Sequence, residues 1–210
     1  MEFYEVALTQ RSIRRFKPDP VPDEVLWRIL DTAIRAPSSG NSQPWIWLVV
    51  REEVKRRAIS DEVRRRMEAS GALGQMRQRA AQAQNPTDRR IWNNAADFRA
   101  NMANAPVFVI PCLYADGVPA ANQRTLNGGS SIYGAVQNLM LAARAEGLGT
   151  SLTGANDDIV RSVLHLPEGA VPACLIPLGY PDGERFGPTT RKPIDTVTYW
   201  DDWGAGKKRP

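Results

Sequence analysis

The sequence predicts an α+β domain in which helices pack on a sheet of four or five strands. Segments with apolar residues at spacings of three and four alternate with short, continuous apolar runs of strand length. The 210 residues are 42% hydrophobic and 24% charged, which suits one domain over residues 1–210 with a core of its own. No apolar run is long enough to cross a bilayer, so we expect no membrane partner.

Two helices separated by an extended stretch are expected before residue 37. Residues 4–9 are mildly apolar and predict a short helix, and residues 10–16 lead into a proline cluster that keeps the chain extended. An apolar stripe at helical spacing begins at Asp23, with acidic residues in its first turn. Pro37 ends this second helix.

A polar loop and a strand follow the second helix. Residues 36–45 contain two prolines, which fix φ, and Gly40, which permits a conformation that a Cβ would forbid. Hydroxyl and amide side chains lie between them, so this loop can hold a flat polar molecule by its edge. The apolar run 45–50 predicts a buried strand.

Two helical regions are predicted between residues 52 and 104. Residues 52–70 predict a charged helix with one apolar face. Between residues 71 and 104 the pattern weakens, and we expect a mobile helical excursion. Its aromatic residues, Trp92 and Phe98, belong either to a lid over a ligand or to a dimer contact.

The second half of the chain predicts further strands around one strong helix. Residues 107–113 predict a strand and residues 116–129 a long polar loop. Residues 130–146 form the strongest helical pattern, and their small side chains indicate the middle of the core or a dimer interface. Glycines stand at both ends of this pattern.

Three short elements complete the predicted fold. Residues 150–153 predict a short strand that follows a tight glycine turn, and residues 173–178 predict another strand. Between these strands we expect Asn156 to cap a helix that runs through Leu164.

The residue inventory excludes several kinds of catalytic site. The single histidine, His165, lies at a predicted helix end, cannot build the usual zinc site and has no Gly-x-Ser-x-Gly elbow to accompany it. Cys112 and Cys174 lie in apolar runs without metal-ligand spacing, which predicts buried, reduced thiols in a cytoplasmic protein. The pair Gly147-x-Gly149 lacks the third glycine of the dinucleotide fingerprint, so we expect no Rossmann site.

The charge distribution favours a phosphorylated small molecule over a nucleic acid. The net charge is +4, and basic residues are interleaved with acidic ones, as in residues 51–57. Arg11 and Arg14, with Ser12, form either a solvated face or a phosphate clamp of guanidinium forks and a hydroxyl. A chain that is poor in acid–base groups but rich in phosphate donors is typical of an enzyme whose chemistry is carried by an organic cofactor.

Four segments of the chain resemble the FMN-dependent nitroreductase family. Their order and spacing match over nearly the whole sequence, and the Ser-Ser-x-Asn-x-Gln-Pro-Trp element is the most specific of them. The four segments are residues 11–16, 36–45, 147–150 and 191–193.

The resemblance implies a mostly antiparallel sheet and an interlocked homodimer with two FMN molecules at its interface. Residues 130–146 would be the central dimer helix. The implied reaction is ping-pong hydride transfer from NADPH or NADH, through FMN N5, to a small oxidised acceptor such as a nitroaromatic or a quinone. The resemblance implies no catalytic side chain and no metal.

The flavin contacts are also implied by the resemblance. The arginine-rich segment and the two basic residues near the C-terminus would close on the phosphate, and the polar loop would follow the ribityl chain and the ring. Main-chain groups after the glycine turn would include a donor near N5. The cofactor-binding residues expected in this way are Arg11, Ser12, Arg14, Pro37, Ser38, Ser39, Asn41, Leu152, Thr153, Gly154, Arg191 and Lys192.

The sequence departs from the family pattern in places. Gln10 stands where many relatives have an arginine, so the phosphate clamp is expected to be one cation lighter. Residues 71–104 would form the substrate wall, and residues 207–210 have no assigned role. A reductive dehalogenase or flavin-fragmenting enzyme of the same fold, a non-catalytic flavin-binding module, and a nucleic-acid-binding module that uses residues 51–66 remain alternatives.

Overall fold

The computed structural model describes residues 1–115 and 120–206. The first part of the predicted polar loop, residues 116–119, and the basic C-terminal residues 207–210 lie outside the described residues. Within the described residues, no helix is long and apolar enough to span a membrane.

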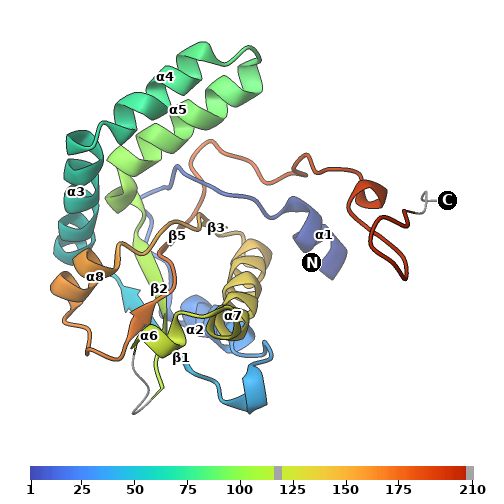
Figure 1. Ribbon diagram of the computed structural model, residues 1–210. Coiled ribbons are helices and arrows are strands. Elements are labelled where there is room, and N and C mark those ends of the chain that lie inside the picture. The colour runs from blue at the N-terminus through green and yellow to red at the C-terminus, as the bar shows by residue number, and fades with distance from the viewer. Residues whose placement is uncertain (116–119, 207–210) are drawn as a thin grey trace.

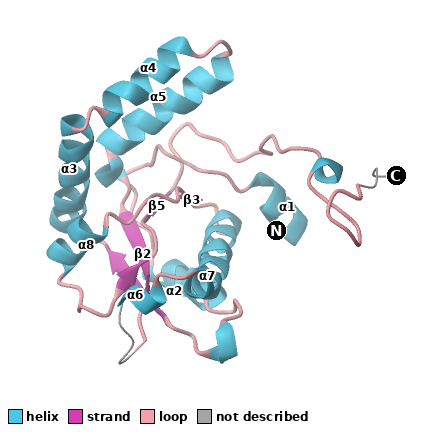
Figure 2. Ribbon diagram, viewed as in Figure 1, coloured by secondary structure: helices cyan, strands magenta, loops and turns pink. Residues whose placement is uncertain are grey.

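The centre of the molecule is a five-stranded sheet whose strand pairs are all antiparallel (Figure 2). The order is β1-β2-β5-β3, and β4 also pairs with β2. The longest pairing runs from Trp45 opposite Leu113 to Val50 opposite Phe108. The predicted α+β class is therefore confirmed. The strands are β1 (Trp45–Val50), β2 (Val107–Leu113), β3 (Gly149–Thr150), β4 (Val171–Pro172) and β5 (Ile176–Gly179).

Helices cover both faces of the sheet, and β2 shows why (Figure 1). All seven residues of β2 are buried, because successive side chains point to opposite faces and both faces are covered. Val107 and Val109 join the core beneath α2 and α7, whereas Phe108 and Ile110 join the core beneath α3 and α8. The helices are α2 (Asp23–Ala33), α7 (Leu126–Ala145), α3 (Glu53–Ala69) and α8 (Asp157–Leu164).

The predicted helical excursion is a pair of helices, α4 (Ala72–Gln82) and α5 (Pro86–Ala100), joined by a short turn. They lie side by side and project away from the sheet (Figure 1). Asn85 caps α5, because its side chain accepts a hydrogen bond from the Asp88 amide at 2.7 Å. We refer to α4 and α5 as the helical hairpin. A short turn, η2 (Met102–Asn104), leads from it into β2.

The predicted polar loop before the central helix is wrong where the structure describes it. A short helix, α6 (Ala120–Gln123), occupies part of that loop, and α7 begins at Leu126 rather than near residue 130. Thr125 is the reason, because its hydroxyl accepts a hydrogen bond from the Gly128 amide at 3.1 Å and so satisfies a free donor of the first turn.

Four other local predictions need correction. Within the run 173–178 only residues 176–178 are strand, because β4 ends at Pro172 and β5 begins at Ile176. The predicted strand 150–153 is shorter, since β3 ends at Thr150 and an isolated bridge from Thr153 to Leu175 follows it. β1 is an edge strand with Ile46 exposed to 47%, not a buried strand. Asn156 precedes α8 but makes no side-chain cap.

The N-terminal segment lies along the short strand β3. After α1 (Phe3–Thr9) the chain extends, Ser12 bridges to Thr150, and the Ile13 amide donates to the Thr150 carbonyl at 2.9 Å. A Cβ on Gly149 would lie 2.6 Å from the Ile13 Cβ, so a glycine is needed for this close approach. Ile13 is thereby buried, and the residues on either side of it are fixed in place.

The C-terminal residues form an arm that leaves the body of the protein on the same side as α1 (Figure 1). The Gly187 amide donates to the Thr9 carbonyl at 3.3 Å, and beyond it the arm contains only one short turn, η3 (Ile194–Thr196), before Trp203. The Trp203 side chain is 93% exposed.

Candidate functional site

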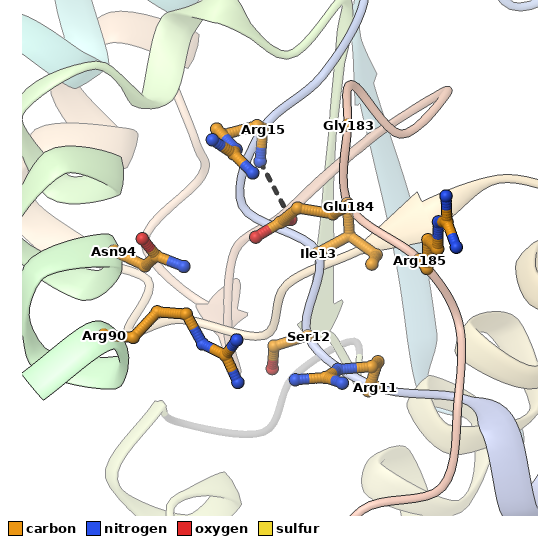
Figure 3. Close-up of a pocket in the computed structure, with 9 residues that line it drawn as sticks. All are labelled: Arg11, Ser12, Ile13, Arg15, Arg90, Asn94, Gly183, Glu184 and Arg185. Atoms are coloured by element: carbon orange, nitrogen blue, oxygen red, sulfur yellow. Dashed lines mark hydrogen bonds between the residues drawn. The ribbon is translucent and has the colours of Figure 1, made fainter. Parts of the chain in front are cut away.

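A basic cavity of about 230 Å³ opens between the N-terminal segment, α5 and the turn after β5 (Figure 3). Ile13 is buried in the core on one side of the cavity, and α5 forms another wall. We refer to this cavity as the basic cavity. It is lined by Arg11, Ser12, Ile13, Arg15, Arg90, Asn94, Gly183, Glu184 and Arg185.

Glu184 is the one carboxylate that lines this cavity, and it is engaged by the backbone. Its Oε2 accepts hydrogen bonds from the amides of Arg14 and Arg15, the latter at 3.2 Å. Gly183 has φ +66°, and this left-handed turn lets the chain double back so that the carboxylate reaches those amides. Glu184 therefore fixes the shape of the N-terminal segment.

The guanidinium groups of the basic cavity have no carboxylate partner among the described residues. Unpaired cations in a concave site attract anions, and guanidinium forks match phosphate oxygens in particular. A hydroxyl beside them adds a further donor. The four unpaired groups belong to Arg11, Arg15, Arg90 and Arg185.

Arg14 lines a neighbouring cavity of about 380 Å³, together with Asn101 and Asn104. Burial lowers the pKa of Arg14, with Glu184 opposing and the Arg11 cation adding to this effect. Burial and the Arg14 cation likewise lower the pKa of Arg99. Both guanidinium groups stay charged at neutral pH. The predicted clamp is thus split, since Arg11 and Ser12 line one cavity and Arg14 the other.

Residues 151–154 present two free amides next to the N-terminal segment. The Ser151 amide donates to the Pro177 carbonyl at 3.2 Å, and the Thr153 amide donates to the Leu175 carbonyl at 2.9 Å. The amides of Leu152 and Gly154 make no hydrogen bond within the part of the chain that the structure describes. Among residues 152–154, the amides of Leu152 and Gly154 are therefore the ones free to donate to a ligand.

The Thr153 hydroxyl gives a second sign of an incomplete site. Thr153 is only 4% exposed, and its Oγ1 has no hydrogen-bond partner among the described residues. Leaving a buried hydroxyl unpaired costs about 1–3 kcal/mol, so a ligand atom that pairs with it would be stabilised.

The polar loop is exposed and conformationally strained. Gly40, Asn41 and Gln43 all have positive φ, at 58°, 53° and 48°. The Ser38 hydroxyl accepts from the Gln43 amide at 3.0 Å, and the Ser39 amide donates to a serine hydroxyl of α7 at 3.2 Å. Strain of this kind collects at binding sites, which supports the predicted role of the loop.

One chain does not bring all the predicted residues together. No residue of the polar loop, from Pro37 through Asn41, lines the basic cavity or the neighbouring cavity of Arg14. Arg191 and Lys192 lie on the C-terminal arm, where the Arg191 side chain donates to the neighbouring Thr190 carbonyl at 3.0 Å, and they line neither cavity.

Several lining residues were missed by the sequence analysis. Arg90 and Asn94 are four residues apart on α5 and therefore share a helix face, which the sequence could have indicated. Nothing in the sequence indicates that this face turns toward residue 11. Arg185 and Glu184 were missed for the same reason.

The two cysteines and the single histidine do not line the basic cavity or the neighbouring cavity of Arg14. Cys112 and Cys174 are both buried and free, and burial raises the pKa of each to about 12, so neither is a thiolate at neutral pH. His165 ends α8 in a left-handed conformation, with φ +54°. No cluster of metal-ligating side chains occurs among residues 1–115 and 120–206.

The hydrogen-bond donors described above suit the binding of flavin mononucleotide better than they suit a metal site or a site for nucleophilic catalysis. That cofactor needs cations and a hydroxyl for its phosphate, polar groups for its ribityl chain and hydrogen bonds for the edge of its ring. The basic cavity, the Thr153 hydroxyl and the free amides of Leu152 and Gly154 offer these kinds of group.

Comparison with known proteins gives an independent result. Residues 7–180 match the family model described as the nitroreductase family. An NADH dehydrogenase of Thermus thermophilus is 31% identical over 208 residues, covering 92% of this chain and 93% of the relative.

Solved structures agree on the fold. An iodotyrosine deiodinase bound to FMN and 3-iodo-L-tyrosine has a TM-score of 0.69 at 23% identity, covering 96% of this chain and 99% of that one. The FMN-dependent nitroreductase NfnB of Mycobacterium smegmatis, in complex with NADPH, has a TM-score of 0.68 at 20% identity, covering 95% and 97%.

Proposed function

Because the chain belongs to the nitroreductase family, we propose that it is an FMN-dependent oxidoreductase that uses NADPH or NADH to reduce small, electron-poor acceptors. Nitroaromatics and quinones are the acceptor classes that we propose. The observation that carries this proposal is the set of unpaired guanidinium groups in the basic cavity. The two free amides and the unpaired buried hydroxyl of residues 152–154 support it.

When bound, FMN supplies the capacity to take up and give up a hydride, and the residues of the chain bind and orient it. Arg11 and Ser12 hold the phosphate. The amide of Leu152 or Gly154 donates to the edge of the ring and stabilises charge that develops there. No side chain is assigned as a general base.

We also propose a homodimer, in which the polar loop of one subunit completes the site of the other. Two observations support this arrangement. The loop and the basic cavity do not meet within one chain, and large apolar side chains on α1 and on the arm are exposed. The exposed side chains include Phe3, Tyr4, Leu8, Trp200 and Trp203. Sedimentation equilibrium should give twice the mass of the chain.

The spectrum of the protein tests the proposed cofactor and reaction. We expect the purified or FMN-reconstituted protein to absorb near 450 nm and to bleach when NADPH or NADH is added without oxygen. Adding a nitroaromatic or a quinone should restore the absorbance. A protein that binds FMN but is not bleached by either nucleotide would contradict the proposed reaction.

The acceptor screen should also contain a halogenated tyrosine. The fold is shared with the deiodinase named above, so dehalogenation is the alternative that this test separates from nitro or quinone reduction. Halide release with no turnover of nitro or quinone compounds would replace the proposed acceptor class.

A further inference from the structure

We propose that Arg90 of α5 joins Arg11 and Ser12 in a single subsite for a phosphate monoester, and that a phosphate bound there fastens the helical hairpin to the N-terminal segment. In its FMN form this inference rests on the proposed function. The phosphate belongs either to FMN or to the 2′-position of NADPH, and the experiment below separates these two sources.

The first argument is geometric. Arg90 extends from α5 toward the N-terminal segment, and its guanidinium lies across from the Ser12 hydroxyl and the Arg11 guanidinium (Figure 3). Asn94, one turn further along α5, lines the same cavity. These groups come from two elements that are almost eighty residues apart in the sequence, and all of them can donate to one anion.

The second argument is that Arg90 differs from three other arginines of the hairpin, whose side chains are engaged. Arg77 pairs with Asp97 at 3.3 Å, Arg79 lies over the Trp92 ring with its Cζ 5.0 Å from the centroid, and Arg89 donates to a carbonyl at 3.4 Å. Arg90 has no such partner among the described residues. Its position opposite another unpaired cation is unfavourable until an anion lies between them.

The third argument concerns the number of cations. In residues 10–12 the one cation is Arg11, because position 10 is Gln and position 12 is Ser. Arg90 supplies a guanidinium to the same cavity from a different element. Arg90 therefore adds a second cation to the side of the cavity opposite Arg11.

A structural consequence follows from the position of Arg90. The hairpin packs on α3 and projects from the body, whereas Arg11 and Ser12 follow α1 (Figure 1). A phosphate held from both sides links these two elements. Loading of the site should therefore restrict the hairpin.

The test compares FMN with riboflavin, which lacks only the phosphate. Both are titrated by flavin fluorescence into the wild-type protein, Arg90→Gln and the neighbouring control Arg89→Gln. We expect Arg90→Gln to weaken FMN binding by about 10- to 100-fold, the range for a lost hydrogen bond between charged groups, and to leave riboflavin binding unchanged. Arg89→Gln should change neither affinity.

A second measurement, the KM for NADPH and for NADH, identifies the source of the phosphate. If Arg90→Gln leaves FMN binding intact but raises the KM for NADPH and not for NADH, the subsite holds the 2′-phosphate, and the proposed subsite stands. Equal weakening of FMN and riboflavin, or no change in any of these values, would overturn it.

A further probe separates this inference from the proposed function. If the wild-type protein binds no flavin, inorganic pyrophosphate is used with thermal unfolding as the readout. A rise in Tm that is lost in Arg90→Gln but kept in Arg89→Gln supports the anion subsite without FMN. No rise in the wild-type protein would overturn the subsite as well.

Hydrogen exchange tests the link to the hairpin. Amides of residues 83–85, in the turn between α4 and α5, should exchange more slowly with FMN than with riboflavin, and Arg90→Gln should remove this difference. Equal protection by both flavins would overturn the proposed fastening of the hairpin.

Discussion

The arginines of α3 and those of the basic cavity differ in their partners. Four of the five arginines of α3 pair with carboxylates three or four residues away, which sit on the same helix face. In the basic cavity the guanidinium groups come from the N-terminal segment, α5 and the turn after β5, and they have no carboxylate partner among the described residues. The ion pairs of α3 are Arg57–Glu53 at 2.7 Å, Arg64–Asp61 at 3.0 Å, Arg65–Glu62 at 2.6 Å and Arg66–Glu62 at 2.8 Å.

This difference shows that an anion site is identified by cations that lack carboxylate partners, rather than by the number of cations. Residues 51–66 hold more basic residues than the basic cavity, and they suggested a nucleic-acid-binding surface. Their charge is largely neutralised along the helix, and Arg66 also pairs with Asp158 of α8. The basic cavity holds fewer cations, but they are unpaired, so it is the better candidate for a phosphate-binding site.

The largest expected effect comes from comparing the loss of an unpaired cation of the basic cavity with the loss of a paired cation of α3. Arg11→Gln should weaken FMN binding by about 100-fold, because an unpaired guanidinium that meets a phosphate contributes fully to binding. Arg65→Gln removes the same charge from an existing ion pair and should leave the affinity within about twofold. Fluorescence titration measures both. Equal losses would show that the net charge of the protein, rather than the cavity, attracts the cofactor.

A smaller effect is expected from moving the wall of the cavity without touching a charge. Gly149→Ala places a methyl group against Ile13, and we expect it to lower the free energy of unfolding by about 1–3 kcal/mol. Urea denaturation measures this loss.

Gly74→Ala in α4 is the matched control for that substitution. The added methyl group meets no atom within 4 Å, so stability should be unchanged or slightly higher. If both variants lose the same stability, close approach at Gly149 is not the cause.

The smallest effect concerns the paired arginines. Hydrogen bonds from Arg65 and Arg66 lower the pKa of Glu62 to about 2, from an ordinary value of 4.5. The stability that this carboxylate contributes is present above pH 4.5 and is lost as the pH falls toward 2. Wild type and Glu62→Gln should therefore differ slightly in urea midpoint at pH 6 and converge near pH 2.5. A difference that does not depend on pH would contradict this pairing.

Much of the fold could be predicted because its signals are local. The boundaries of β1 and β2 and the first residue of α2 follow from apolar runs and from acidic residues at a helix start. The start of α7 could not be predicted from its glycines, because Thr125 caps the helix before them. The start of β5 at Ile176, rather than at residue 173, depends on where this segment pairs with β2, and pairing between distant segments is not a local property.

The candidate site was predicted in part. Arg11 and Ser12 were found from the sequence and do line a cavity, whereas Arg90, Arg185 and Glu184 were not found. The predicted roles of the polar loop, of Arg191 and of Lys192 stay predictions, because in the single chain these residues line neither the basic cavity nor the neighbouring cavity of Arg14.

The sequence by itself determined the α+β class and the family resemblance, because both follow from patterns that can be read within short segments of the chain. Only the tertiary structure decided that Arg90 faces Arg11, that Glu184 is occupied by backbone amides and that the amides of Leu152 and Gly154 are free. The physical reason is that a cation is available to a ligand only when no neighbour satisfies it. In this protein those neighbours come from elements that are distant in the sequence.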